Sequence, residues 1–141
     1  MGEKVKVVFD TNVLISIFME KRLRDAFLRE RRKLVVYISE DIGLELSKVL
    51  QYQKVSEILG KTGISKKDAL RILIVNSRKV EPSLKLHAVN EDAEDNKILE
   101  CALEARADII VSGDKHLLQL GKFKKTRILS PREFFDSLKS K

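Results

Sequence analysis

The stretch VVFDTNVLIS, residues 7–16, interrupts an apolar run with an aspartate, a threonine and an asparagine. A carboxylate inside an apolar segment is costly to bury unless it finds partners. Residues 4–9 are short, β-branched and apolar, which is typical of a buried strand in a parallel sheet. Asp10 therefore stands where a strand is expected to end and a helix to begin.

Segments typical of strands and helices alternate along the rest of the chain. Further strands are expected at 34–38, 108–114 and 126–129. Helices are expected at 21–33, 39–50, 65–78, 93–107 and 130–138, and Ser130 and Glu133 have the spacing of a helix-capping box. This alternation predicts a single α/β domain over residues 1–141, with helices on both faces of a parallel sheet.

The charge and the cysteine content of the chain limit the kinds of partner and metal site that it can have. The 141 residues include 28 Lys and Arg against 21 Asp and Glu, which gives a net charge of +7. That charge favours a polyanionic partner, although a merely soluble surface has a similar composition. The single cysteine, Cys101, excludes an intramolecular disulfide and a cysteine-based zinc cluster.

Two further features of the sequence concern histidines and targeting. His87 and His116 are too few and too scattered for a histidine-rich metal site, and surface or structural roles are expected for them. No segment has the pattern of a signal peptide or the ~20 apolar residues of a membrane span. We therefore expect a cytoplasmic protein that does not enter the membrane.

Four acidic residues are expected at or near one edge of the sheet. Sites in α/β sheets form at the carboxyl ends of the strands, where Asp10 and Asp114 stand. Glu45 and Asp95 lie on helices that should pack nearby. Each acid also has a structural alternative, as a helix cap or, for Glu45, as a solvent-exposed side chain.

Together, four carboxylates at one edge would repel each other and raise their pKa values. A bound divalent cation relieves that repulsion, and oxygen ligands suit Mg²⁺ or Mn²⁺. The residues alone leave both alternatives open, a set of separate caps or a metal centre.

The motifs FDTNVLIS, SEDIGLELSKVL, DAEDNKILECALEARAD and IIVSGDKHLL resemble, in this order, the acidic motifs of the PIN-domain nucleases. The chain is most similar to the VapC-like toxins of toxin–antitoxin pairs. The resemblance implies a three-layer α/β/α sandwich around a parallel sheet. It also implies Mg²⁺- or Mn²⁺-dependent cleavage of RNA, a small antitoxin partner and a homodimer.

The resemblance also implies roles for individual residues. The acids implied to be catalytic are Asp10, Glu45, Asp95 and Asp114, and those implied to hold metal are Asp10, Asp95 and Asp114. Asn12 and Ser112 match polar positions that support the acids, and many family members have Thr in place of Ser112. Asp92 matches a position that is acidic in some members and is a further supporting residue.

Two basic segments are candidates for contacts with RNA phosphates. The candidate residues are Arg24, Arg29, Arg31 and Arg32 in the helix at 21–33, and Lys124 and Lys125 in the segment 122–127. Such contacts give salt-dependent affinity that does not read sequence. The alternative is an ordinary solvated helix face.

Other functions fit the sequence less well but stay open at this point. A PIN fold without catalysis would only bind RNA. A phospho-acceptor signalling domain clusters its acids differently along the strands. A phosphatase of the haloacid dehalogenase type needs a second Asp two residues after the first, where this chain has Asn12.

Overall fold

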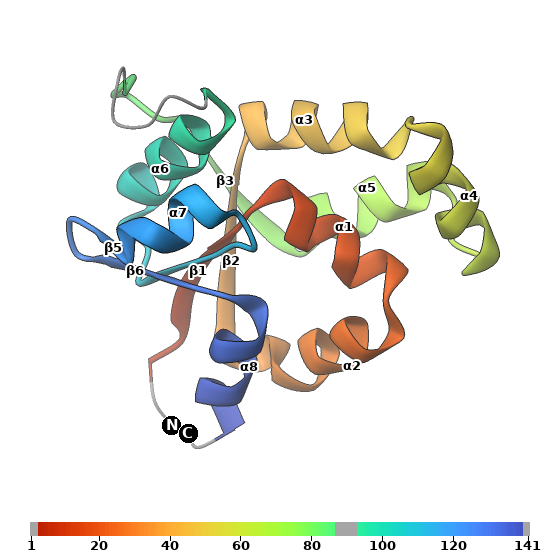
Figure 1. The fold of residues 1–141 in the computed structure, drawn as a ribbon, viewed down its shortest axis with the longest axis horizontal. Helices are drawn as coiled ribbons and strands as arrows, with labels where there is room; N and C mark the ends of the chain where they lie inside the picture. Colours follow the sequence, from red (N-terminus) through yellow and green to blue (C-terminus); the bar gives the residue numbers. More distant parts are fainter. Residues whose placement is uncertain (1–2, 87–92, 140–141) are drawn as a thin grey trace.

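The computed structural model describes residues 3–86 and 93–139. Within these ranges six strands form one sheet in the order β3-β2-β1-β4-β6-β5 (Figure 1). The strands are β1 (Val5–Phe9), β2 (Leu34–Ser39), β3 (Ser77–Val80), β4 (Ile109–Val111), β5 (Lys122–Phe123) and β6 (Thr126–Leu129). All neighbouring strands are parallel except β5 and β6, which are antiparallel.

Helices cover both faces of this sheet. They are α1 (Thr11–Met19), α2 (Lys21–Glu30), a short 3₁₀ helix η1 (Arg31–Lys33), α3 (Glu40–Leu50), α4 (Gln53–Lys61), α5 (Lys66–Val75), α6 (Ala93–Ala105), α7 (Lys115–Leu120) and α8 (Pro131–Lys139). In Figure 1, α6 lies on one side of the central strands, and α1, α2 and α5 lie on the other. The predicted α/β/α sandwich is therefore confirmed. None of the helices in the described ranges has the length and apolarity needed to cross a membrane.

The sequence prediction missed three elements. Helix α4 was not predicted, and the helix expected at 65–78 ends at Val75 because Ser77 already begins β3. Strand β3 reads Ser-Arg-Lys-Val and pairs only with β2, so it lacks the apolar character of a central strand. Strand β5 has two residues and turns back at Lys124, which has a φ of 53°. A short, polar strand at the edge of a sheet lacks the apolar pattern by which strands are predicted from sequence.

The capping box predicted at Ser130 and Glu133 is present at the start of α8. The Ser130 hydroxyl accepts a hydrogen bond from the Glu133 backbone N–H, and the Glu133 carboxylate accepts one from the Ser130 N–H. These bonds from Ser130 lower the pKa of Glu133. Ser65 likewise accepts a hydrogen bond from the Asp68 N–H at the start of α5. Local polar spacing therefore fixed these helix boundaries.

An aromatic cluster anchors the end of β1, directly before Asp10. The Phe9 ring is 1% exposed and lies 6.0 Å from Phe27 on α2 and 5.9 Å from Phe134 on α8, between ring centroids. Phe135 completes the cluster, with its ring centroid 5.1 Å from that of Phe134. These edge-to-face contacts hold α2 and α8 against the strand end.

We expect Phe134→Ala to lower the free energy of unfolding by about 3–5 kcal/mol, because it removes a fully buried ring from this cluster. Urea denaturation measures the change. The matched control is Phe123→Ala on edge strand β5, where the ring is only half-buried and a smaller loss is expected. Equal losses in the two variants would contradict the anchoring role of the cluster.

Candidate active site

The acidic edge begins with the register between β1 and β4. Phe9 pairs with Val111, and the Asp10 N–H donates a hydrogen bond to the Val111 carbonyl oxygen at 2.9 Å. The chain leaves β1 toward β2 on one side, while β4 lies on the other side. This is a topological switch point, where α/β sheets open a crevice at the carboxyl ends of their strands. Residues 10 and 112 consequently follow two adjacent strand ends.

Asp10 occupies the N-cap position of α1 but does not act as a cap. Its side chain makes no capping hydrogen bond to α1. Instead, its Oδ2 accepts a hydrogen bond of 2.7 Å from the Ser112 hydroxyl. The capping alternative for Asp10 is therefore wrong, and its carboxylate faces the β4 end of the crevice.

Ser112 connects the two strand ends. This residue is fully buried, and the same Oγ that donates to Asp10 accepts a hydrogen bond of 2.9 Å from the Asp114 N–H. A hydroxyl can donate one hydrogen bond and accept others, so both contacts form at once. Ser112 thus sets the direction of the Asp10 carboxylate and the path of the chain into Asp114.

Asp114 is a cap, as one of the two alternatives predicted. Its Oδ1 accepts hydrogen bonds from the backbone N–H groups of His116 at 2.8 Å and Leu117 at 3.2 Å, at the start of α7. These bonds fix the orientation of the carboxylate at the mouth of the crevice. A capping role and a role in the acidic cluster are therefore compatible in this residue.

Asp95 reaches the cluster from α6, on the side of the sheet opposite α1. It lies in the first turn of α6, which packs against β1, β2 and β4. Asp95 is only 3% exposed. Ligand atoms of Asp95, Asp114 and His116 all lie within 4.8 Å of one another. A buried carboxylate beside another acid is destabilised by their repulsion, and a positive charge between them relieves it.

The donor set fits a hard divalent cation. Two ligands on opposite sides of a Mg²⁺ ion are about 4 Å apart, because Mg–O distances are close to 2 Å. The 4.8 Å spread of the cluster requires only small side-chain movements to reach that spacing. Two carboxylates supply hard oxygen atoms, and a histidine nitrogen adds a softer donor.

His116 is the residue that the sequence analysis missed. It was expected to have a surface or structural role, yet its Nδ1 lies 4.0 Å from Asp114 Oδ1. Its side chain is 65% exposed. His116 therefore lies at the surface and is also one of the three residues of the cluster. The spacing Asp-x-His at the start of a short helix was the available signal.

The other residues expected at the site lie around the cluster. Glu45 is half-buried on α3, a helix that packs against both α1 and α6. It is not part of the group within 4.8 Å. Asn12 is exposed in the first turn of α1, and Asp92 lies outside the described residues. Cys101 is buried away from these groups, and burial raises its pKa to about 12.

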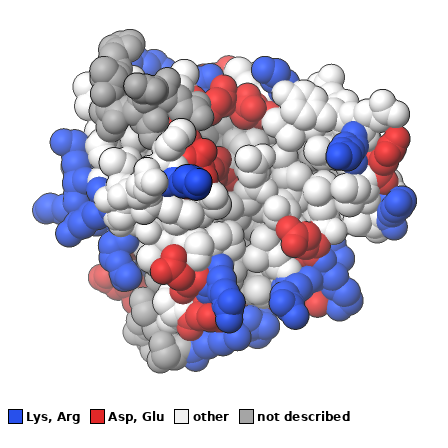
Figure 2. Space-filling model, in the orientation of Figure 1, with Lys and Arg blue, Asp and Glu red and all other residues white. Residues whose placement is uncertain are grey.

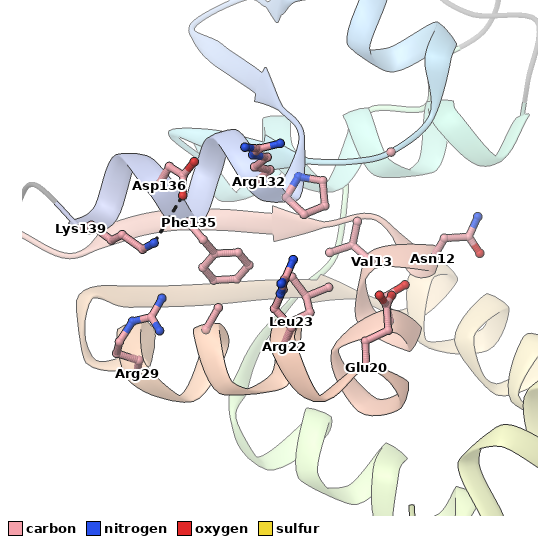
Figure 3. A pocket seen from close by; sticks show the side chains of 14 residues that line it. Asn12, Val13, Glu20, Arg22, Leu23, Arg29, Arg132, Phe135, Asp136 and Lys139 are labelled. Atoms are coloured by element: carbon pink, nitrogen blue, oxygen red, sulfur yellow. Dashed lines mark ion pairs between the residues drawn. The ribbon is translucent and has the colours of Figure 1, made fainter. Parts of the chain in front are cut away.

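A groove leads away from the acidic edge between α2 and α8 (Figure 3). Its volume is about 690 Å³, and Asn12 and Gly113 line it at the end beside the crevice. Its basic residues are Arg22 and Arg29 from α2 and Arg132 and Lys139 from α8. Figure 3 shows Phe135 between these two walls. Two acids, Glu20 and Asp136, also line the groove, and Asp136 pairs with Lys139.

The structure separates the basic residues that the sequence grouped together. Arg29 lines the groove, whereas Arg31 and Arg32 line a different cavity. The Arg24 guanidinium donates a hydrogen bond of 2.8 Å to the Phe18 carbonyl oxygen, so this residue ties α2 to α1. Lys124 and Lys125 are exposed in the turn between β5 and β6.

Charged side chains of both signs are spread over the face shown in Figure 2, and red patches lie among the blue ones along the bottom and at the right. Acidic side chains lie in the upper centre, over the region where α3, α6 and α7 converge in Figure 1. Lysine and arginine side chains gather on the left, over β5 and β6, and along the bottom, over α2 and α8. A polyanion approaching this face would meet its densest groups of cations at the left and along the bottom.

Comparison with known proteins assigns this arrangement to a family. A family model described as PIN domain matches residues 6–116, which include the whole acidic edge. The chain belongs to the PIN domain family. The resemblance of the chain to the PIN-domain family is thereby confirmed.

Two further likenesses agree with this assignment. The chain is 31% identical to "Uncharacterized protein MJ1680" of Methanocaldococcus jannaschii over 149 aligned positions, covering 94% of this chain and 91% of the relative. Its fold is also similar to a crystal structure of VapBC2 from Rickettsia felis bound to a DNA fragment from their promoter. That similarity has a TM-score of 0.58 at 13% identity and covers 88% of this chain and 97% of that one.

Ser112→Ala should lower the affinity for Mn²⁺ by about 10–100-fold, the scale seen when a group that orients a metal ligand is removed. Its hydroxyl fixes both Asp10 and the approach to Asp114. Calorimetric titration measures the affinity, and Ser112→Thr should restore it because the hydroxyl is retained. If Ser112→Ala binds Mn²⁺ like the wild type, the orienting role is wrong.

His116→Ala should reduce Mn²⁺ affinity more than Mg²⁺ affinity, because an imidazole nitrogen favours first-row transition metals over Mg²⁺. Titrating each variant with each metal gives the ratio of the two affinities. A matched control is Lys115→Ala, which changes the neighbouring exposed side chain and should leave the ratio unaltered. An unchanged ratio in His116→Ala would return His116 to a surface role.

Proposed function

We propose that this PIN domain is a Mg²⁺- or Mn²⁺-dependent ribonuclease that hydrolyses RNA phosphodiester bonds at the acidic edge. The observation that carries the proposal is the convergence of Asp95 and Asp114 within 4.8 Å, with Asp10 joined to the same edge through Ser112. These carboxylates come from the β1–α1 junction, α6 and the β4–α7 connection.

Each residue has a definite task in this proposal. Asp10, Asp95 and Asp114 hold the divalent ion, with His116 as a fourth donor. When bound, the ion supplies positive charge for the scissile phosphate and lowers the pKa of a water molecule. Ser112 orients Asp10, and Glu45 is the candidate acid for positioning the attacking water from α3. Asn12 and Asp92 are proposed supporting residues.

The groove between α2 and α8 is the proposed path for the RNA strand. It begins at Asn12 and Gly113 beside the acids, and Arg22, Arg29 and Arg132 line it farther along. Arginine and lysine side chains bind phosphates without reading the bases. Lys124 and Lys125 provide additional positive charge on the same molecule, over the β5–β6 turn.

The proposal extends to biological partners. The VapBC2 structure is a complex of that protein pair with promoter DNA, and the shared fold supports a VapC-like toxin role with a small antitoxin partner. A homodimer and a cytoplasmic location belong to the same proposal. A PIN domain that binds RNA without cutting it is the second candidate. The converging carboxylates argue against it, because a purely basic groove would suffice for binding.

Asp10→Asn separates cutting from binding. The side chain is not a helix cap, and an amide oxygen can still accept the Ser112 hydrogen bond, so the melting temperature should stay close to the wild-type value. RNA cleavage in Mn²⁺ should fall by roughly 10²-fold or more, because the charge that holds the ion is lost. RNA affinity through the groove should persist.

The matched control is Asp68→Asn, which removes one exposed carboxylate from α5, far along the chain from the cluster. It should cut RNA at the wild-type rate. Cleavage assays with a single-stranded RNA, melting curves and RNA affinities are measured for all three proteins. Wild-type cleavage by Asp10→Asn would exclude the proposed nuclease centre.

A further inference from the structure

A second cationic cavity lies at the opposite edge of the sheet. Four basic residues line it: Lys4, Arg31, Arg32 and Arg78. The cavity has a volume of about 400 Å³, and none of the described residues that line it is acidic. We refer to it as the basic pocket. It contrasts with the groove at α8, where Glu20 and Asp136 are present.

The basic pocket is separate from the acidic edge. Lys4 precedes β1, Arg31 and Arg32 precede β2, and Arg78 lies near the start of β3. Lys4, Arg31 and Arg32 stand at the amino ends of β1 and β2, and Arg78 pairs with Tyr37 partway along β2. The acidic cluster lies instead beyond the carboxyl ends of β1 and β4. A strand of six residues, such as β2, spans about 20 Å. The amino-end cations of the pocket therefore lie about one strand length from the acidic edge.

The four cations are exposed residues, and none of their side chains forms an ion pair or a hydrogen bond within residues 3–86 and 93–139. Neighbouring basic residues do find acids, since Lys33 lies 2.9 Å and Arg29 3.4 Å from Glu30. Four unpaired positive charges around one cavity repel each other, and an anion between them relieves that repulsion.

The wall of the basic pocket also holds an unsatisfied hydroxyl. Among the described residues, Ser77 Oγ is buried and has no hydrogen-bond partner. Ser77 lines the pocket next to Arg78, and it also lines a neighbouring cavity that is almost entirely apolar. Buried hydroxyl groups nearly always find partners. A rotation of this side chain toward the basic pocket would let a water or phosphate oxygen accept its hydrogen.

The basic pocket adjoins the far end of the groove. The Lys33 ammonium group donates a hydrogen bond of 2.9 Å to the Leu138 carbonyl oxygen, which ties η1 to the end of α8. Arg29 and Lys139 line the groove at the adjoining ends of α2 and α8. Arg31 and Arg32 of η1 then line the basic pocket. Cations therefore continue from the groove into the pocket.

We infer that the basic pocket is a second phosphate-binding site for single-stranded RNA, which holds the part of the strand remote from the acidic edge. The inference rests on the proposed ribonuclease function and adds a requirement on substrate length. An RNA long enough to reach both sites binds more tightly, because its second contact forms within the same complex at high effective concentration. An RNA shorter than the roughly 20 Å between the sites makes only one contact and has no such gain in affinity.

The test compares two variants with the same change in charge. The pocket variant carries Lys4→Ala, Arg31→Ala, Arg32→Ala and Arg78→Ala. The control variant carries Lys54→Ala, Lys61→Ala, Lys66→Ala and Lys67→Ala, four exposed lysines on or beside α4 and α5. Fluorescence anisotropy without divalent metal measures the affinity of the full chain for one short and one long single-stranded RNA at several salt concentrations.

The pocket variant should bind the long RNA at least about tenfold more weakly, and its salt slope should fall by up to about 3, from four lost contacts at roughly 0.7 each. Its affinity for the short RNA should change little. The control variant should bind both RNAs with nearly the wild-type affinity and salt slope. Equal losses in both variants, or equal losses for both RNA lengths, would overturn the inference. So would binding of the wild-type pocket to vesicles containing anionic lipid in preference to RNA.

Two measurements keep the outcome interpretable. Melting curves verify folding, and the milder Arg31→Gln and Arg32→Gln double variant replaces the quadruple variant if that protein unfolds. Cleavage of the short RNA in Mn²⁺ is measured in parallel. Normal cutting with unchanged long-RNA affinity contradicts only the second site, whereas absent cutting with the expected loss of affinity contradicts only the nuclease proposal.

Discussion

The pairing of Phe9 with Val111 is the constraint on which the acidic edge depends. This register puts the residues after β1 and β4 side by side, and the Ser112 hydroxyl then bridges Asp10 and the Asp114 backbone. A shift of one residue would turn every side chain to the opposite face of the sheet. The ring cluster around Phe9 stabilises the strand end against such a shift, because α2 and α8 both pack on that ring. Core packing and site geometry are thus properties of the same few residues.

The acidic cluster and the basic pocket lie toward different ends of the parallel strands. The cluster follows the carboxyl ends of β1 and β4, and the pocket is beside the amino ends of β1 and β2. Between them the groove mixes both signs, with Asp136 paired to Lys139. A polyanion is therefore attracted at the basic pocket and repelled at the acidic cluster. A divalent ion at that place reverses the local sign, so metal and RNA would bind there with mutual support.

The sequence predicted what depends on local patterns. Apolar β-branched runs marked β1, β2 and β4, and polar spacing marked the start of α8. It also predicted that Asp10 and Asp114 would follow strands at one edge, because parallel strands end together. Strand β3 was missed because a polar edge strand is specified by its neighbour β2 and not by its own composition. The place of His116 in the cluster depends on the direction of α7, which only the folded chain determines. Likewise, the division of the basic segment between two cavities follows from the turn into η1.

The capping bonds of Asp114 mean that the two strand-end aspartates respond differently to substitution. The Asp114 carboxylate terminates the backbone of α7 as well as facing the cluster. The Asp10 side chain makes no such bond to α1 and accepts a hydrogen bond from Ser112 instead. Substitution of Asp114 therefore removes two hydrogen bonds from the start of α7 whether or not a metal ion binds, whereas substitution of Asp10 leaves the start of α1 with the backbone bonds that it already has.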